Sequence, residues 1–164
     1  MSNYRPKPAS DAIRRSMSSN RPRDTQLELD FRSALHRAGL RFRKNVRPIS
    51  GLRCEPDVVF PSARLAVFID GCWWHGCPKH GMLPMAHREW WANKLQKTKA
   101  RDVANTEALE SEGWKVLRIW EHEPIPLAVQ EVQRELARLR ERPGGGATQH
   151  GGSASHKAPG GSED

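Results

Sequence analysis

Three segments of the chain predict helices, and in the first and last of them apolar residues lie about one helical turn apart. The first begins near residue 25 and ends at Gly39, because glycine is a good C-terminal stop. Its apolar residues are Leu27, Phe31, Leu35 and Ala38. A long helix is predicted for residues 88–112, and an amphipathic helix for residues 127–142.

Four shorter segments have the composition of β-strands. Residues 40–46 alternate apolar and basic side chains, which predicts a half-buried strand. Residues 57–60 and 65–69 are separated by a turn and predict a hairpin. Residues 114–120 are apolar at nearly every position, so this strand is expected to be central or mostly buried. The order of these elements indicates a mixed β-sheet flanked by helices, of the α/β or the α+β class, and α/β is the class that we predict.

The two ends of the chain differ in composition from the segment between them, so residues 23–142 are expected to form one domain. Residues 1–22 are basic, rich in proline and serine, and poor in large apolar groups. Two interpretations stay open for them: a disordered tail, or a basic arm that orders on a phosphate backbone. Residues 143–164 are expected to be a disordered Gly/Ser-rich tail, in which His150 and His156 are poor site candidates.

The net charge and the cysteine content indicate which class of partner and which cell compartment to expect. The 164 residues carry a formal net charge of +8 with a pI of about 9.9, which favours a polyanion such as nucleic acid. The longest apolar run, residues 65–69, is too short to span a membrane, and the N-terminus lacks the apolar core of a secretory signal. Three cysteines favour metal-bound or free thiols in a reducing cytosol, so a cytoplasmic, nucleoid-associated protein is expected.

The predicted hairpin brings two carboxylates together. Asp57 begins its first strand and Asp70 follows its second, so antiparallel pairing would set them side by side. Two close carboxylates repel unless a cation lies between them. A second interpretation stays open, in which Asp70 is only a turn residue before Gly71 and Asp57 only follows a proline.

A cysteine- and histidine-rich segment follows Asp70 directly. Cys72, Cys77 and His80 have a spacing compatible with three zinc ligands, and His122 or His87 could supply the fourth. The alternative is buried cysteines with surface histidines. We call residues 72–80 the knuckle.

Other side chains in and near the knuckle leave their roles open. His75 could be a spare ligand, a packed imidazole or a catalytic group. In each of the doublets Trp73–Trp74 and Trp90–Trp91, one tryptophan can join the core, and the other is either exposed by chance or available to stack on bases.

Glu28 has a sufficient structural reason to exist, because Thr25 and Glu28 have the spacing of a capping box at the start of the first helix.

A set of short motifs together resembles the very short patch repair (Vsr) endonucleases, over roughly residues 14 to 123. The motifs are Arg23-Asp24-Thr25-x-x-Glu28, Pro56-Asp57, Phe68-x-Asp70-Gly71-Cys72-x-Trp74-His75, residues 91–94, Arg101-Asp102, Gly113-Trp114-x-Val116 and Trp120-Glu121. The resemblance implies a PD-(D/E)xK, restriction-endonuclease-like fold. It also implies magnesium-dependent nicking of double-stranded DNA 5′ to the thymine of a T:G mismatch, with a separate structural zinc. Proteins of the repair pathway are candidate partners, and a monomer is expected.

Carried over residue by residue, the resemblance assigns the site. Asp57 would be the main magnesium ligand, with the Ile69 carbonyl beside it, and His75 would transfer a proton near the scissile phosphate. Glu28 would orient His75 or a metal-bound water. The residues expected to wedge into the base stack are Trp73, Trp74 and Trp91. The expected zinc ligands are Cys72, Cys77, His80 and His122.

Two positions depart from the pattern. Asp70 stands where the best known member has histidine, but at the second acidic position of the nuclease class, which suggests that Asp57 and Asp70 clamp two magnesium ions. Cys72 stands where that class has its lysine.

Two other functions remain as alternatives. One is a non-catalytic zinc DNA-binding module that uses the same basic surface and tryptophans, and the other is a general or restriction-type nuclease of the same fold class.

Overall fold

The computed structural model describes residues 25–80, 83, 85 and 87–141. The elements of this part, in chain order, are α2 (Gln26–Arg37), β1 (Val58–Phe60), the 3-10 helix η1 (Pro61–Ala63), β2 (Leu65–Asp70), α3 (Arg88–Ser111), β3 (Lys115–Trp120) and α4 (Ile125–Glu141). The predicted basic arm, residues 1–22, and the predicted tail, residues 143–164 with His150 and His156, lie outside the described residues. Among the described helices, none is long and apolar enough to cross a bilayer.

The sheet has the strand order β1-β2-β3 and is mixed, which confirms the predicted α/β class. β1 pairs with β2 in the predicted antiparallel hairpin, with Val58 opposite Val67. β2 pairs with β3 in parallel, with Asp70 opposite Trp120. Because β3 lies at an edge of this sheet and only its Ile119 is buried, the expectation of a central or mostly buried strand was wrong.

The strand predicted for residues 40–46 is reduced to a single bridge, in which Arg43 and Val59 exchange two backbone hydrogen bonds of 2.8 Å. Asn45 has a φ of 54°, in the left-handed region. Extended backbone cannot continue through such a residue, so the pairing stops after one bridge.

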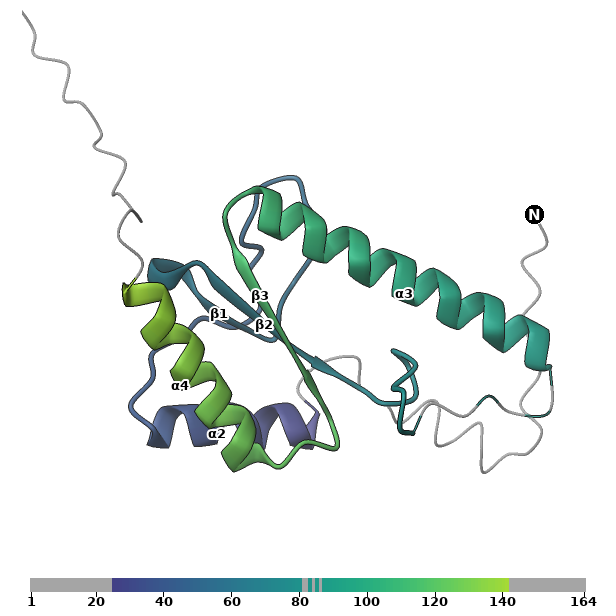
Figure 1. Cartoon of the computed structure of the whole chain (residues 1–164), viewed down its shortest axis with the longest axis horizontal. Coiled ribbons are helices and arrows are strands. Elements are labelled where there is room, and N and C mark those ends of the chain that lie inside the picture. Colours follow the sequence, from purple (N-terminus) through teal and green to yellow (C-terminus); the bar gives the residue numbers. More distant parts are fainter. Residues whose placement is uncertain (1–24, 81–82, 84, 86, 142–164) are drawn as a thin grey trace, which may run out of the picture.

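The two faces of the sheet carry different side chains because strand residues alternate in direction. Leu65, Val67 and Ile69 contribute to the larger core, which α2 and α4 cover. Ala66 and Phe68 contribute to a smaller core with Leu109 of α3. Figure 1 shows this arrangement, with α2 and α4 on one side of the strands and α3 on the other. Polar residues of β2 that lie an even number of positions from Phe68 therefore also face α3.

Helix α3 is much longer than the sheet that it covers. Its C-terminal part packs against β3 through residues such as Leu109, while its N-terminal part extends past the strand ends (Figure 1). The knuckle lies beside this extension, because it follows β2 directly. The helix thereby brings charged and aromatic side chains to the end of β2.

Candidate active site and metal centre

Asp57 lies where β1 begins, beside the end of β2. Its Oδ2 accepts a hydrogen bond of 2.7 Å from the backbone N–H of Ile69. Because the N–H and C=O of one strand residue point to the same side, the Ile69 carbonyl also points toward Asp57. Burial raises the pKa of Asp57 to about 6, and the Glu28 carboxylate adds to this rise while the Ile69 N–H opposes it. A cation would therefore stabilise the ionised form of this carboxyl.

Glu28 forms the predicted capping box and also faces the surroundings of Asp57. Thr25 Oγ1 accepts a hydrogen bond of 3.3 Å from the Glu28 N–H and donates one of 3.0 Å to Glu28 Oε1. Arg32 donates to Glu28 Oε2 at 2.9 Å and to the Asp57 carbonyl at 3.3 Å. Glu28, Arg32 and Asp57 line one pocket of about 360 Å³. Glu28 can therefore cap α2 and also lie at the site.

Asp70 ends β2 and is paired with Arg118 of β3. Arg118 Nε lies 2.6 Å from Asp70 Oδ2, and Arg118 Nη2 lies 2.8 Å from Asp70 Oδ1. This is a bidentate pair, and Asp70 is only 4% exposed. Burial lowers the pKa of Arg118, but the hydrogen bond and charge of Asp70 outweigh it, so this pKa is raised overall.

His75 is held by an acid from another element. Its backbone N–H donates to the Gly71 carbonyl at 3.1 Å, and its ring Nδ1 lies 2.6 Å from Oδ2 of Asp102 on α3. The same Nδ1 lies 3.7 Å from Asp70 Oδ1. His75, Asp70 and Asp102 line a cleft of about 510 Å³, together with Arg118. An imidazole held by an acid at Nδ1 presents Nε2 for proton transfer.

The expectation that Asp57 and Asp70 lie side by side needs correction. Val58 pairs with Val67, so the register sets Asp57 opposite Phe68, and the carboxylates of Asp57 and Asp70 line different pockets. The two carboxylates are held apart by different partners. The Ile69 N–H binds Asp57, and Arg118 binds Asp70. They remain close enough for the charge of Asp70 to raise the pKa of Asp57.

Two residues of this cleft had no role in the sequence analysis. Asp102 was named there only within a motif, and Arg118 is a charged residue within an apolar strand. Arg118 lies opposite Phe68 in the parallel register and so shares the face of Asp70. The sequence did contain a signal for Arg118. It is a charged residue in a mostly apolar strand, and it lies two strand positions from an acid, Asp70, on the neighbouring strand.

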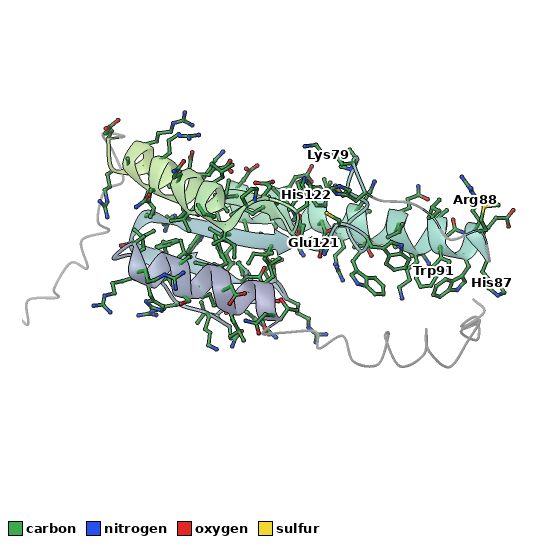
Figure 2. All side chains as sticks on the ribbon, turned by 90° about the horizontal axis from the view of Figure 1, so that it is seen from below. Lys79, His87, Arg88, Trp91, Glu121 and His122 are labelled. Carbon is green, nitrogen blue, oxygen red and sulfur yellow. The ribbon has the colours of Figure 1, made fainter. Side chains whose placement is uncertain are left out.

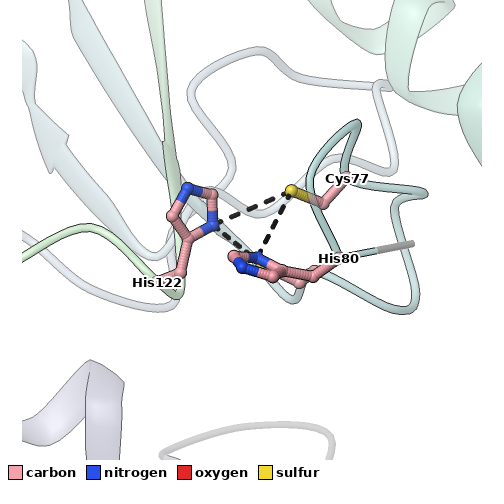
Figure 3. Close-up of side chains that lie close together, drawn as sticks. Cys77, His80 and His122 are labelled. Carbon is pink, nitrogen blue, oxygen red and sulfur yellow. Dashed lines mark hydrogen bonds between the residues drawn. The ribbon is translucent and has the colours of Figure 1, made fainter. Parts of the chain in front are cut away.

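Four side chains predicted as zinc ligands meet at the knuckle. The ligand atoms of Cys72, Cys77, His80 and His122 all lie within 4.8 Å of one another. Figure 3 shows Cys77, His80 and His122 turned toward a common point. His122, and not His87, is therefore the fourth member. Figure 2 shows His87 at the far end of α3, well away from His122.

The donor set fits a zinc ion. With Zn–S near 2.3 Å and Zn–N near 2.0 Å, ligand atoms of a tetrahedral site lie about 3.3–3.8 Å apart. The Sγ to Nδ1 distances are 3.6 Å for Cys72–His80 and 3.7 Å for Cys77–His122. Those for Cys72–His122 and Cys77–His80, 3.0 and 3.9 Å, lie on either side of this range, so the four atoms surround a space close to the size of a zinc site. Two thiols and two imidazoles in this arrangement are a complete ligand set without an open position.

The tryptophans form a cluster on the surface. Trp73 contacts Trp74 and Trp91 with ring centroids 4.5 and 4.7 Å apart, and Trp90 contacts Trp91 at 4.6 Å. The Lys94 ammonium lies 5.1–5.5 Å from the rings of Trp74, Trp90 and Trp91. None of the four rings is buried in either core, so neither doublet contributes the core tryptophan that it could have supplied. Trp74 is the most open, at 36% exposure.

Comparisons with known proteins identify the family of this chain. Residues 9–80 match the family model described as DNA mismatch endonuclease Vsr. The type II nicking enzyme V.NaeI of Lentzea aerocolonigenes is 41% identical over 82% of this chain and 82% of its own length. The type II nicking enzyme V.XorIIP of Xanthomonas oryzae pv. oryzae is 40% identical over 71% of this chain and 85% of its own. The DNA mismatch endonuclease Vsr of Escherichia coli strain K12 is 35% identical over 60% of this chain and 62% of its own.

The family match extends over α2, the hairpin and the knuckle. The similarities exclude the non-catalytic DNA-binding module, because the family and its relatives are endonucleases. The chain belongs to the Vsr family of DNA endonucleases.

Proposed function

We propose that the protein nicks double-stranded DNA 5′ to the thymine of a T:G mismatch, by magnesium-dependent phosphodiester hydrolysis in very short patch repair. One observation carries the proposal: a carboxyl suited to bind a cation, Asp57, and an imidazole held by an acid, His75, flank the same end of β2. Family membership and the E. coli relative support the mismatch as the target.

Asp57 and the Ile69 carbonyl are the groups that would hold magnesium, because Mg²⁺ prefers oxygen ligands and both oxygens point to one side of the strand end. A bound magnesium ion would neutralise charge that develops on the phosphate oxygens. Glu28 shares the pocket of Asp57 and would orient groups next to the scissile phosphate.

His75 would carry the proton transfer. Asp102 accepts the Nδ1 proton at 2.6 Å, which fixes the tautomer that leaves Nε2 free toward the substrate. His75 lines a cleft of about 510 Å³, so its ring can be reached from outside the protein. A positioned imidazole contributes typically about 10²- to 10⁴-fold to such reactions.

The tryptophan cluster would supply mismatch recognition. Trp73, Trp74 and Trp91 contact one another beside the knuckle, and their partial exposure leaves ring faces available to unstacked bases. Inserting a wedge costs unstacking energy, which is least at a mispair. The zinc at Cys72, Cys77, His80 and His122 would fix these rings relative to His75 and act as a structural metal.

The proposal is tested by incubating duplexes that carry one T:G pair with the full-length protein and magnesium. Wild type is expected to nick the thymine strand, and Asp57→Ala to leave it intact under the same conditions. Equal absence of nicking in wild type and Asp57→Ala would remove the claim.

One alternative substrate has an observation in its favour, since two of the relatives are named type II nicking enzymes. A nickase of fully paired DNA would cut a T:A duplex of the same sequence at a comparable rate.

A further inference from the structure

Asp70 differs from Asp57 in having both carboxylate oxygens engaged by a fixed cation. Arg118 donates to Oδ2 from Nε at 2.6 Å and to Oδ1 from Nη2 at 2.8 Å. His75 Nδ1 lies 3.7 Å from the same Oδ1. The carboxyl of Asp70 is buried, so water does not screen these contacts.

Arg118 is itself built into this position. The parallel register sets it opposite Phe68, and its guanidinium carbon lies 5.0 Å from the Phe68 ring centroid. Asp70 follows Phe68 by two residues on the same face of β2, which brings it to the polar edge of the stacked guanidinium. Arg118 Nη2 also lies 3.5 Å from Asp102 Oδ2. A ring and two acids thus fix the guanidinium.

This arrangement disfavours the binding of a metal ion at Asp70. A magnesium ion binds carboxylate oxygens at about 2.0–2.1 Å, which would put it within a few ångströms of the guanidinium charge. The carboxylate of Asp57 has different partners: its Oδ2 accepts from the Ile69 backbone N–H, and the nearby Arg32, which donates to the Asp57 carbonyl and to Glu28 Oε2, also favours its ionised form. The two acids of the strand end are therefore suited to different cations.

We propose that Arg118 is a positioning residue that takes the place of a second metal ion at Asp70. Asp57 is then the acid of the strand end that binds a divalent ion. Asp70, through Arg118, holds Asp102, whose Oδ2 receives both His75 Nδ1 at 2.6 Å and Arg118 Nη2 at 3.5 Å. The proposal deepens the proposed function and rests on it for the ion at Asp57.

The test counts divalent ions on the full-length, zinc-loaded protein with Mn²⁺ as the probe, using the electron paramagnetic resonance signal of free Mn²⁺. The variants are D57N, D70N, R118M and the double variant D70N/R118M. E107Q is the control, because Glu107 is an exposed carboxylate that lines the same cleft without a contact to Arg118. Near-ultraviolet circular dichroism checks that each variant folds.

Wild type, D70N and E107Q are expected to bind one Mn²⁺ with affinities within about twofold of one another, and D57N to lose it. R118M is expected to bind one further ion, which D70N/R118M loses again. A tenfold loss of Mn²⁺ affinity in D70N would overturn the proposal, as would a folded R118M that gains no ion. If R118M does not fold, the comparison of D70N with wild type decides alone.

The readout separates this proposal from the proposed function. A protein that shows this binding pattern but never nicks a T:G duplex would refute the function and leave the role of Arg118 standing. A protein that nicks T:G duplexes but loses Mn²⁺ affinity in D70N would support the function and refute the role of Arg118.

Discussion

His75 Nδ1 and Asp102 Oδ2 lie 2.6 Å apart although 27 residues separate them in the chain. The knuckle positions the histidine and α3 positions the acid, so the pair forms only when both elements pack against the end of β2. A hydrogen bond of this length between an imidazole and a carboxylate fixes the ring and its tautomer.

Removing the carboxylate of this pair should cost activity without costing the fold. In Asp102→Asn the amide can bond the other tautomer of His75, so Nε2 no longer faces the substrate in the form that accepts a proton. We expect single-turnover nicking to fall by about 10²- to 10⁴-fold. Glu110→Gln, at an exposed position on the same helix outside the cleft, should keep the wild-type rate. An Asp102→Asn variant as active as wild type would contradict the role of the pair.

Asp57 should lower the stability of the magnesium-free protein as the pH rises. The folded state keeps its proton up to about pH 6, while an unfolded aspartate releases it near pH 3.9. Between these values the folded state binds more protons, so raising the pH lowers the free energy of unfolding through this group, and the full cost is present above pH 6. Asp57→Asn should therefore be more stable than wild type at pH 7, by up to about 3 kcal/mol.

Urea unfolding between pH 4 and 8, without magnesium, measures this difference. Asp30→Asn serves as the control, since Asp30 is an exposed acid on α2. The gap between Asp57→Asn and wild type should open as the pH rises from 4 to 6 and then stay constant. A gap independent of pH would show that burial does not raise the pKa of Asp57.

The knuckle should hold one zinc per chain through its four side chains. His122→Ala and Cys77→Ala remove a ligand each and should lose zinc, while His87→Ala should retain it, because His87 lies outside the cluster. Loss of zinc should also loosen Trp73, Trp74 and His75, and so reduce nicking. Metal content of the purified variants by mass spectrometry measures this directly. Zinc retained in His122→Ala would exclude His122 as a ligand.

Trp74 should contribute to binding of the mismatch. Its ring is the most exposed of the cluster, and stacking of a base on an aromatic side chain is worth about 1–3 kcal/mol. Trp74→Ala should weaken binding of T:G duplex about 5- to 150-fold, measured by fluorescence anisotropy without magnesium. Leu127→Ala, an exposed apolar residue on α4, should bind as wild type does. An unchanged affinity in Trp74→Ala would refute stacking by this ring.

The periodicity of the sequence predicted the helices and the hairpin well, because each has a local signal. Thr25 and Glu28 form the predicted cap, and the two hairpin strands pair as expected. The strand predicted for residues 40–46 failed, because alternation of side chains does not reveal that Asn45 adopts a positive φ.

The site was harder to predict because it depends on contacts between distant segments. The cluster of candidate zinc ligands could be predicted, since three of its four residues are close together in the chain. The separation of Asp57 from Asp70 could not, because it depends on Arg118 in a strand that pairs only after α3 has crossed over. The tryptophans were misplaced for a similar reason, since packing of rings on one another leaves no periodic signal.

The decisive measurement is the ratio of single-turnover nicking rates on T:G and T:A duplexes of identical sequence, with the cut mapped to the nucleotide. The proposed function predicts a magnesium-dependent nick 5′ to the mispaired thymine in the T:G duplex, with a much slower reaction on T:A, and loss of the nick in both Asp57→Ala and His75→Ala. Equal rates on the two duplexes, or undiminished nicking in either variant, would contradict it.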